Sequence, residues 1–349
     1  MAVYTPLTQQ EIEAFLAQYD VGELASFEGI VEGVSNSNYL VVTTQAKYIL
    51  TLFENIININ ELPYFTHLMA WWHARGIHCP QPMAMRDERV LSALKEKPAL
   101  LVNFLEGSGV TKITLDHMLQ LGTLAAQMHL TGMDFPYVRA NALSLSGWEA
   151  LIDAIDGRAD DISPGLTRLI SEEYNYLEDH WPQDLPAGPI HADLFPDNVF
   201  FSSFPSPFGG EGGVKGKASY GALLKHSPLP NPPPQGGRVL KLCGVIDFYF
   251  ACNDAWAYDL AICANAWCFD DRHRFVPERA QAMVQAYTQI RSLTPEEDAA
   301  FPLLLRGAAL RFLLTRAHDW LHRDPSAQVT PKDPMEYVAK LRFWQENRL

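Results

Sequence analysis

The spacing of hydrophobic residues changes near residue 106, and this change constrains the fold more than any other feature of the sequence. Before it, short runs rich in β-branched and aromatic residues are separated by polar turns, which predicts an antiparallel sheet. The runs are residues 26–31, 39–44, 48–54, 90–92 and 99–105. Helical spacing is found at 8–19, where Thr8 and Glu11 form a capping box, and at 61–76.

Beyond residue 106 helical spacing dominates, beginning at Leu115 and continuing to the end of the chain except between 190 and 250. A length of 349 residues also exceeds what one hydrophobic core usually serves. We therefore expect an α+β protein of two lobes. The first, at 1–106, is small and contains the antiparallel sheet, and the second, at 107–349, is larger and mainly helical.

The chain is acidic, with 27 Lys and Arg against 41 Asp and Glu and a formal net charge of -14. Such a surface repels phosphate backbones and anionic lipids, which disfavours nucleic-acid and membrane partners. The N-terminus lacks the pattern of a signal peptide, and no apolar run reaches the roughly 18 residues of a membrane span. The five cysteines form no C-x-x-C pair and are expected to be ordinary buried thiols. We expect a cytoplasmic protein that is a monomer or a small homo-oligomer.

Residues 203–239 break the pattern of the second lobe, because they contain 7 Pro and 8 Gly. That composition favours disorder. The segment separates two strand-like runs, 198–202 and 240–246, so it stands where a tight hairpin turn is usual. We interpret it as an insertion, either inert or a Pro-rich docking site for a partner.

The strongest motif runs from Ile190 to Asn198 and has the H-x-D-x-x-x-x-N spacing of a kinase catalytic loop. Phosphoryl transfer to an alcohol needs a carboxylate that accepts the hydroxyl proton and a nearby amide oxygen that holds a metal ion on the phosphates. Asp193 is the candidate for the first role and Asn198 for the second.

A second carboxylate follows on the next strand-like run, where Asp247 comes after three apolar residues. Without the insertion, Asn198 and Asp247 are about a dozen residues apart, which is the span of one hairpin. The spacing therefore predicts that Asn198 and Asp247 hold one Mg²⁺ ion, with ATP as the phosphoryl donor.

The nucleotide phosphates are expected to be covered by residues 32–38, between the first two strands, through Gly33, Ser35, Asn36 and Ser37. An ordinary hairpin turn is the alternative. Kinases also place a lysine on the third strand, but here Thr51 occupies that position. Either another cation substitutes, or the phosphates depend on magnesium and backbone donors. Glu61, at the start of the next helix, is the candidate for the usual partner of that lysine, and a solvated carboxylate at the helix start is the alternative.

Together these stretches resemble the aminoglycoside phosphotransferase and choline kinase superfamily, whose members have a two-lobed protein-kinase-like fold. Within it, the chain is most similar to the bacterial homoserine kinases of that fold. The resemblance covers nearly the whole chain outside the insertion. It is carried by EGVSNSNYLV, YILTLFE, HADLFPDNVFF, VIDFYFACNDAWAYDLAICANAWCF and RGAALRFLLTRAHDWL.

The resemblance implies that the chain transfers the γ-phosphoryl group of ATP to the side-chain hydroxyl of L-homoserine, a step toward threonine. It also implies that Thr51 is normal in this branch of the superfamily.

A zwitterionic acceptor needs a cation for its carboxylate and an acidic or carbonyl group for its ammonium. Arg306, Arg311 and Arg316 are candidates for the cation, although steps of five residues on a helix prevent all three from facing one pocket. Four further residues could shape the acceptor pocket: Tyr249, Asn253, Asp254 and Trp267, the last of which is also a candidate core residue. His191 and Asp259 are candidates for structural support of the catalytic loop, and simple solvation is the alternative for Asp259.

Two alternatives remain open at this point. A kinase of the same fold could act on choline, another amino alcohol or an aminoglycoside. A non-catalytic nucleotide-binding scaffold would explain Thr51 in place of lysine, but it would not explain the presence of Asp193, Asn198 and Asp247 together.

Overall fold

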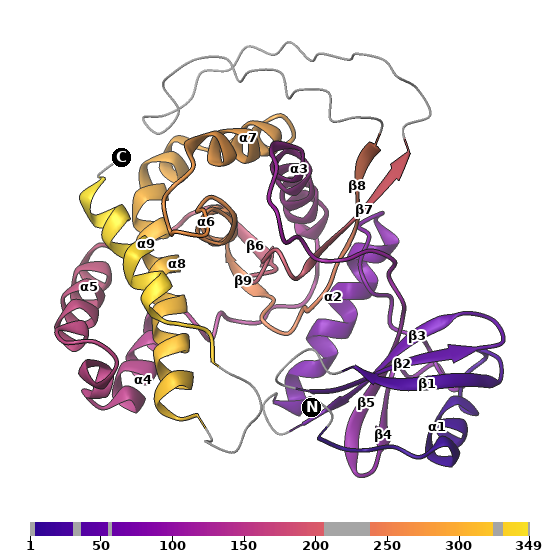
Figure 1. Ribbon diagram of the computed structural model, residues 1–349. Coiled ribbons are helices and arrows are strands. Elements are labelled where there is room, and N and C mark those ends of the chain that lie inside the picture. The colour runs from indigo at the N-terminus through magenta and orange to yellow at the C-terminus, as the bar shows by residue number, and fades with distance from the viewer. Residues whose placement is uncertain (1–3, 31–35, 55–57, 206–237, 324–330, 348–349) are drawn as a thin grey trace. The chain divides into compact units, whose positions relative to one another are not determined.

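The structure is a computed structural model that describes residues 4–30, 36–54, 58–205, 238–323 and 331–347. Contacts divide the chain into two compact units, whose elements are labelled in Figure 1. The first unit consists of Met1–Gly107, Phe135–Arg139 and Cys243–Tyr249, and the second of Ser108–Asp134, Ala140–Leu242 and Phe250–Leu349. Two short segments from later in the sequence therefore belong to the first unit.

The first unit contains a five-stranded sheet with the order β1-β2-β3-β5-β4, in which every neighbouring pair is antiparallel. Its strands are β1 (Leu24–Ile30), β2 (Asn36–Thr43), β3 (Lys47–Phe53), β4 (Leu91–Leu94) and β5 (Lys97–Asn103). The predicted antiparallel sheet is confirmed. β2 begins three residues before the predicted strand because Asn36 and Ser37, which suggested a turn, are buried and bonded within the sheet.

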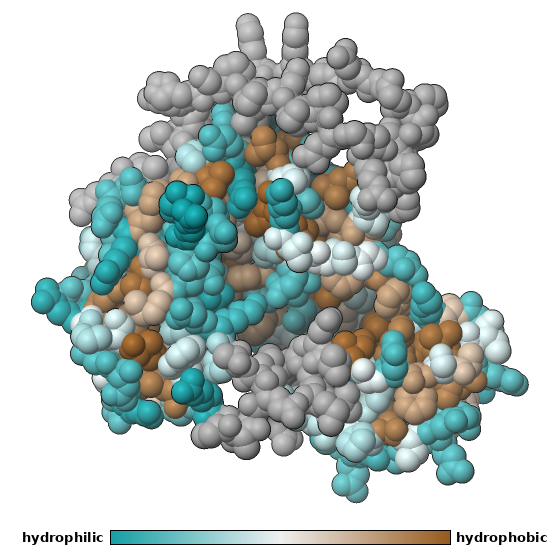
Figure 2. Space-filling view, viewed as in Figure 1, coloured by the Kyte–Doolittle hydropathy of each residue, from teal (hydrophilic) through white to brown (hydrophobic). Residues whose placement is uncertain are grey.

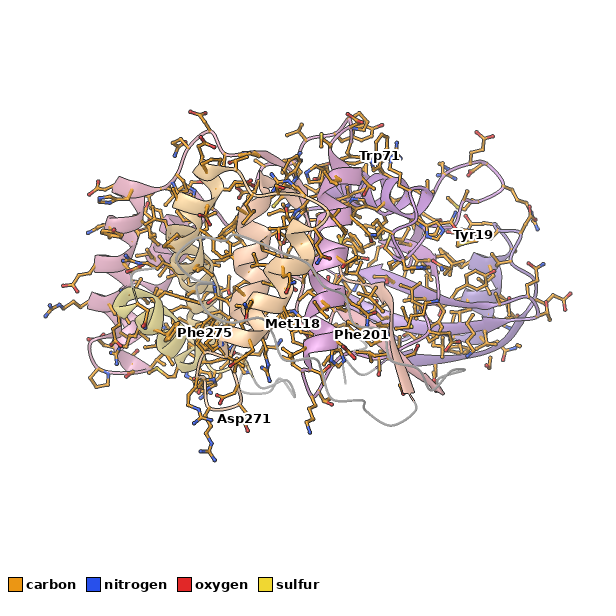
Figure 3. All side chains as sticks on the ribbon, turned by 90° about the horizontal axis from the view of Figure 1, so that it is seen from above. Tyr19, Trp71, Met118, Phe201, Asp271 and Phe275 are labelled. Atoms are coloured by element: carbon orange, nitrogen blue, oxygen red, sulfur yellow. The ribbon has the colours of Figure 1, made fainter. Side chains whose placement is uncertain are left out.

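Helix α1 (Gln9–Leu16) packs on one face of this sheet. The predicted capping box is present, since Thr8 Oγ1 accepts from the N–H of Glu11 and the Glu11 carboxylate accepts from the N–H of Thr8. Ile12, Phe15 and Leu16 are buried against the sheet. Full burial of such side chains contributes about 1.5–3 kcal/mol each. The helix ends earlier than predicted, but Tyr19, labelled in Figure 3, still belongs to the same core.

A 3-10 turn, η1 (Ile59–Glu61), leads into α2 (Leu62–Ala74), which has Pro at its start. Pro is favoured there because the first helical N–H groups have no partner within the helix. Phe65 and Trp72 on the buried side of α2 contact Tyr249 and Phe248, with ring centroids 5.7 Å and 5.6 Å apart. Helix α2 thus anchors the segment that follows β8.

The second unit is mainly helical, as predicted for this part of the chain (Figure 1). Its helices are α3 (Leu115–Gly132), α4 (Leu145–Ile155), η2 (Arg158–Asp161), α5 (Leu166–His180), α6 (Trp256–Trp267), α7 (Pro277–Thr288), α8 (Pro295–Leu321) and α9 (Met335–Glu346). Nearly every residue of α6 is buried, which identifies α6 as a helix of the core. Helices α3 and α7 approach so closely that a Cβ at Gly122 would lie 2.1 Å from the carbonyl oxygen of Met283.

Two short antiparallel ladders complete the second unit. β6 (Ala187–Ile190) pairs with β9 (Cys252–Ala255), and β7 (Val199–Pro205) pairs with β8 (Arg238–Val245), whose last residues belong to the first unit. The two strand-like runs around the predicted insertion therefore form one pair. Figure 3 marks Met118 on α3 near Phe201 on β7, and the neighbouring His117 ring contacts Phe201 edge-on with centroids 4.6 Å apart. Most of the insertion, residues 206–237, lies outside the described residues.

None of the helices within the described residues is both long enough and apolar enough to cross a membrane. On the face shown in Figure 2, hydrophilic residues are interspersed with hydrophobic ones.

Candidate active site

The catalytic-loop motif connects two strands of the second unit, β6 and β7. Strand β6 ends at Ile190, the motif occupies residues 191–198, and β7 begins at Val199. The loop folds back on itself, because the N–H of Phe195 donates to the carbonyl of Asp193 (2.8 Å) and the N–H of Asn198 donates to the carbonyl of Phe195 (2.9 Å). These bonds bring the two predicted functional side chains of the loop together.

Asn198 donates through its Nδ2 to Asp193 twice, to the carboxylate Oδ2 at 2.8 Å and to the backbone carbonyl at 2.9 Å. This use of the nitrogen leaves the amide oxygen of Asn198 as the acceptor of that side chain. Amide and carboxylate oxygens are the ligands that Mg²⁺ prefers. The amide oxygen of Asn198 is therefore a ligand atom of the kind that Mg²⁺ binds.

Asp259 on α6 is fully buried and holds the catalytic loop through hydrogen bonds to its backbone. Its carboxylate accepts from the N–H of His191 (3.1 Å) and of Ala192 (2.8 Å), and His129 Nε2 lies 3.2 Å away. Burial raises the pKa of Asp259, but the bonds and the charge interactions with His129 and His191 outweigh burial and lower it overall. The sequence left two hypotheses for Asp259, support of the catalytic loop and simple solvation. The burial and the hydrogen bonds of Asp259 match the first.

Two further side chains fix the loop. His191 is fully buried, and its Nδ1 accepts from the N–H of Asp193 at 3.2 Å. Trp267, the last residue of α6, is fully buried and donates from Nε1 to the carbonyl of Leu194 at 2.6 Å. Trp267 is thus a core residue that also holds the loop, and it contributes no exposed surface to an acceptor pocket.

Asp247 belongs to the first unit and follows β8. It is exposed, and its φ of 65° is in the left-handed region, which is uncommon for a residue with a Cβ. The next two residues are anchored by aromatic contacts, Phe248 to Trp72 and Tyr249 to Phe53 and Phe65. The unusual backbone of Asp247 is therefore held by the packing of its neighbours.

On β3, Thr51 is buried and donates from Oγ1 to Asn38 Oδ1 at 2.7 Å. Burial and the charge of Asp247 raise the pKa of the Tyr249 hydroxyl, which a hydrogen bond with Thr51 partly opposes. Thr51 thus belongs to a polar group with Asn38 and Tyr249. Sequence analysis included Asn38 in the 32–38 run but gave it no role of its own, whereas the structure places it within β2.

Glu61, proposed from the sequence as the partner of a strand lysine, pairs with Arg139. Arg139 Nε and Nη2 lie 2.7 Å and 2.6 Å from Glu61 Oε2, and the guanidinium also stacks 5.0 Å from the centre of the Phe65 ring. The expected pairing of Glu61 is thereby corrected. Arg139 was missed because it is distant in sequence and lies outside every recognised motif.

The predicted phosphate-covering residues are described only in part. Gly33 and Ser35 lie outside the described residues, and Asn36 and Ser37 open β2. Ser37 is fully buried, with its Oγ bonded to Glu54 Oε1 at 2.6 Å and accepting from the N–H of Thr5 at 3.0 Å. The Ser37 hydroxyl is therefore used in bonds to Glu54 and Thr5. The backbone N–H of Ser37 remains a candidate donor to phosphate.

Asp254 on β9 is largely buried and accepts from Asn141 Nδ2 at 2.6 Å and from the N–H of Ala255 at 2.7 Å. Burial raises the pKa of this carboxyl, which the two hydrogen bonds and the charge of Arg311 oppose. Asn253, beside it on β9, forms a parallel bridge with Ala140.

The three candidate arginines of α8 point to three different partners, as their spacing predicts. Arg306 forms a two-bond ion pair with Glu173 at 2.7 Å, and Arg316 donates to Glu336 Oε2 at 2.6 Å and to the carbonyl of Asp333 at 3.0 Å. Arg311 donates from Nη1 to the carbonyl of Ala192 in the catalytic loop at 2.7 Å. Arg316 is therefore bonded to α9 and to Asp333 just before that helix, and a contact between Arg316 and the acceptor stays a prediction.

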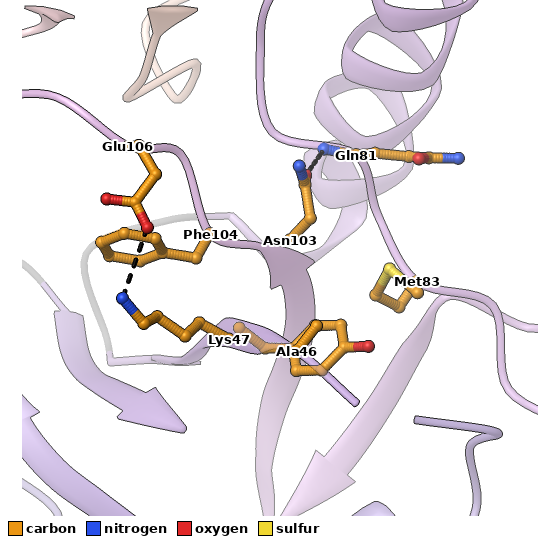
Figure 4. Close-up of a pocket in the computed structure, with 8 residues that line it drawn as sticks. Ala46, Lys47, Gln81, Met83, Asn103, Phe104 and Glu106 are labelled. Atoms are coloured by element: carbon orange, nitrogen blue, oxygen red, sulfur yellow. Dashed lines mark hydrogen bonds and ion pairs between the residues drawn. The ribbon is translucent and has the colours of Figure 1, made fainter. Parts of the chain in front are cut away.

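A separate pocket of about 390 Å³ lies in the first unit (Figure 4). Its edge carries an exposed ion pair, Lys47–Glu106, at 3.3 Å. The lining residues are Ala46, Lys47, Tyr48, Gln81, Met83, Asn103, Phe104 and Glu106. None of them is a predicted site residue, so we assign this pocket no part in the chemistry.

A carboxylate and an adjacent amide on one loop are the arrangement expected of a phosphotransferase. Comparison with known proteins agrees: residues 26–214 and 237–293 match the phosphotransferase enzyme family. The chain belongs to this family. The unmatched residues between the two matched stretches lie inside the Pro- and Gly-rich segment.

Among curated proteins, the chain is 47% identical to a homoserine kinase of Paramagnetospirillum magneticum over 99% of this chain and 97% of the relative. It is 48% identical to a homoserine kinase of Xanthobacter autotrophicus over 99% and 96%. Among solved structures, it is similar to an amicoumacin kinase in complex with AMP-PNP and Ca²⁺, with a TM-score of 0.64, 15% identity and coverage of 97% of this chain and 92% of the other. The expected kinase-like fold is confirmed.

Proposed function

We propose that this chain is an ATP-dependent kinase that phosphorylates the side-chain hydroxyl of L-homoserine to give O-phospho-L-homoserine. The observation that carries this proposal is the 47–48% identity to curated homoserine kinases along nearly the whole of both chains. The local geometry of the catalytic loop supports the reaction type, because a carboxylate and an amide are held together there.

In this proposal Asp193 orients the acceptor hydroxyl and accepts its proton as the phosphoryl group is transferred. Asn198 and Asp247 hold Mg²⁺, which when bound neutralises charge on the transferring phosphates. The amide orientation of Asn198 supports its part, because the nitrogen is used by Asp193 and the oxygen is left for a cation. His191, Asp259 and Trp267 keep the loop in place by bonding its backbone.

For the nucleotide, we propose that the backbone N–H groups of residues 33–37 contact the phosphates and that Thr51 stands beside them. Glu61 supports this lobe indirectly, by fixing Arg139. We also propose residues 1–106 as the nucleotide-binding lobe and 107–349 as the catalytic and substrate lobe.

For the acceptor, we propose that Asp254 binds the ammonium group of homoserine and that Tyr249 contributes to its pocket. Asp254 is supported by its position on β9, whose ladder with β6 leads into the catalytic loop. Binding an ammonium ion would favour the charged form of this carboxyl, whose pKa is otherwise raised by burial.

The proposal is tested by measuring ADP release from ATP and Mg²⁺ with L-homoserine, choline and kanamycin in parallel. We expect turnover with homoserine at a kcat/KM at least about a hundredfold above the other two acceptors. Equal or greater activity with choline or kanamycin would reject homoserine as the acceptor. Light scattering of the same preparation tests the further proposal of a monomer or small homo-oligomer.

A further inference from the structure

The peptide unit that precedes the catalytic aspartate is in an unfavourable conformation. Ala192 has a φ of 63°, in the left-handed region where a Cβ crowds the following carbonyl oxygen. Such conformations persist only where the surrounding structure holds them. Because Ala192 directly precedes Asp193, its backbone sets the direction in which the Asp193 side chain leaves the loop.

Ala192 is held at both of its backbone polar groups. Its N–H donates to Asp259 Oδ1 at 2.8 Å, and its carbonyl accepts from Arg311 Nη1 at 2.7 Å. The two partners come from different helices, α6 and α8, so relaxation of the Ala192 backbone breaks at least one buried bond. A buried polar group that loses its partner is costly, and a charged one is more so.

Arg311 itself is buried, with 1% of the residue exposed. Its guanidinium stacks on Phe312 at 4.6 Å from the ring centre and lies 5.6 Å from that of Phe250. Almost none of its surface is open to a substrate carboxylate. Its hydrogen bond at Nη1 reaches a peptide oxygen, whereas Arg306 and Arg316 on the same helix each pair with a carboxylate.

We infer that Arg311 is a positioning residue of the reaction, which holds the left-handed Ala192 peptide and thereby aims Asp193 at the acceptor hydroxyl. It is not a ligand of the acceptor carboxylate. This inference rests on the proposed function, since it assumes that Asp193 is the base. It predicts that loss of Arg311 slows the chemical step and leaves acceptor binding largely unchanged, because a displacement of about 1 Å in a reacting group can cost on the order of a hundredfold in rate.

The test measures kcat and the KM for homoserine in Arg311→Met and Arg311→Lys, each alone and combined with Ala192→Gly. Glycine adopts positive φ about as readily as negative φ, so a glycine at position 192 depends less on Arg311 to keep the left-handed conformation. We expect Arg311→Met to lower kcat by at least about tenfold with less than a threefold change in KM. We expect Ala192→Gly, added to Arg311→Met, to restore at least about threefold of that loss.

Arg306→Met is the matched control, because it removes another largely buried arginine of α8 that has no bond to the loop. It is expected to lower thermal stability and to leave kcat within about twofold at a temperature where the protein is folded. If Arg311→Met does not fold, Arg311→Lys, which keeps the charge but not the planar fork, provides the same comparison.

The inference is overturned if the Arg311 variants raise the KM for homoserine tenfold with an unchanged kcat, which would make Arg311 an acceptor ligand. It is also overturned if Ala192→Gly restores nothing. Wild type and Asp193→Asn are assayed alongside. Absence of homoserine phosphorylation by wild type would instead defeat the proposed function, so the two failures are distinguishable.

Discussion

The Asn198 side-chain nitrogen lies 2.8 Å from the Asp193 carboxylate, so the amide of one functional residue is oriented by the other. We expect Asn198→Ala to raise the Mg²⁺ concentration needed for half-maximal activity by about tenfold or more, because it removes a proposed metal ligand. A magnesium titration of the initial rate measures this. Asn347→Ala, at the exposed end of α9, is the control and should titrate like wild type. An unchanged magnesium dependence in Asn198→Ala would reject the metal role.

Asp193→Asn is expected to lower turnover by about 10²–10⁴-fold, which is the usual contribution of a positioned general base. Nucleotide binding should persist, since the proposed phosphate contacts lie elsewhere. Steady-state kinetics and the thermal shift caused by ATP with Mg²⁺ separate the two effects. The exposed Asp184 gives the control Asp184→Asn. Full turnover in Asp193→Asn would contradict the assigned role.

The buried Tyr287 hydroxyl joins two other buried groups: it lies 2.8 Å from His129 Nδ1 and accepts from Arg291 Nη1 at 3.0 Å. Tyr287→Phe removes one buried hydrogen bond from each of these two groups, so we expect a loss of about 1–3 kcal/mol in the free energy of unfolding. Chemical denaturation measures it. Tyr137→Phe, at an exposed ring, should change the same quantity by less than about 0.5 kcal/mol. Equal stability of the two variants would show that this network contributes nothing.

The lowered pKa of Glu336 predicts that the stability of the protein depends on pH. Burial raises its pKa, but the charges of Lys340 and Arg316 outweigh burial and lower the pKa from 4.5 to about 2. Because the folded pKa lies below the unfolded one, the stabilisation is full above about pH 4.5 and is lost as the pH falls toward 2.

Glu336→Gln should therefore be less stable than wild type at pH 7, and the difference in Tm should shrink between about pH 4.5 and 2, where wild type also becomes neutral at this position. Thermal unfolding at a series of pH values measures the difference. Glu346→Gln, exposed on the same helix, controls for the substitution. A Tm difference that stays constant across this range would contradict the shifted pKa.

Local patterns in the sequence predicted the parts of the fold and site that depend on neighbouring residues. The order of the main strands and helices of the first unit followed from the spacing of apolar residues, and the proximity of Asp193 and Asn198 followed from a loop of fixed length. The partners supplied by distant helices were harder to predict. His129 is 130 positions from Asp259, and no local pattern marks it as a partner.

The partners of charged side chains were equally hard to predict from the sequence. Helical spacing indicated that Arg306, Arg311 and Arg316 face different directions, but it did not indicate which of them reaches the catalytic loop. Glu61 was assigned to a lysine because family patterns describe that pair, whereas its cation in this chain comes from the 135–139 segment. Polar residues at the start of β2 suggested a turn because sequence alone does not show that Ser37 bonds to Glu54.

The braces on the catalytic loop all bond to peptide groups: Asp259 to the N–H groups of residues 191 and 192, and Trp267 to the carbonyl of Leu194. Every amino acid except proline supplies these groups. Substitution of the side chains at Leu194 and Phe195 therefore keeps every one of these hydrogen bonds, and its cost is set mainly by packing because both side chains are buried.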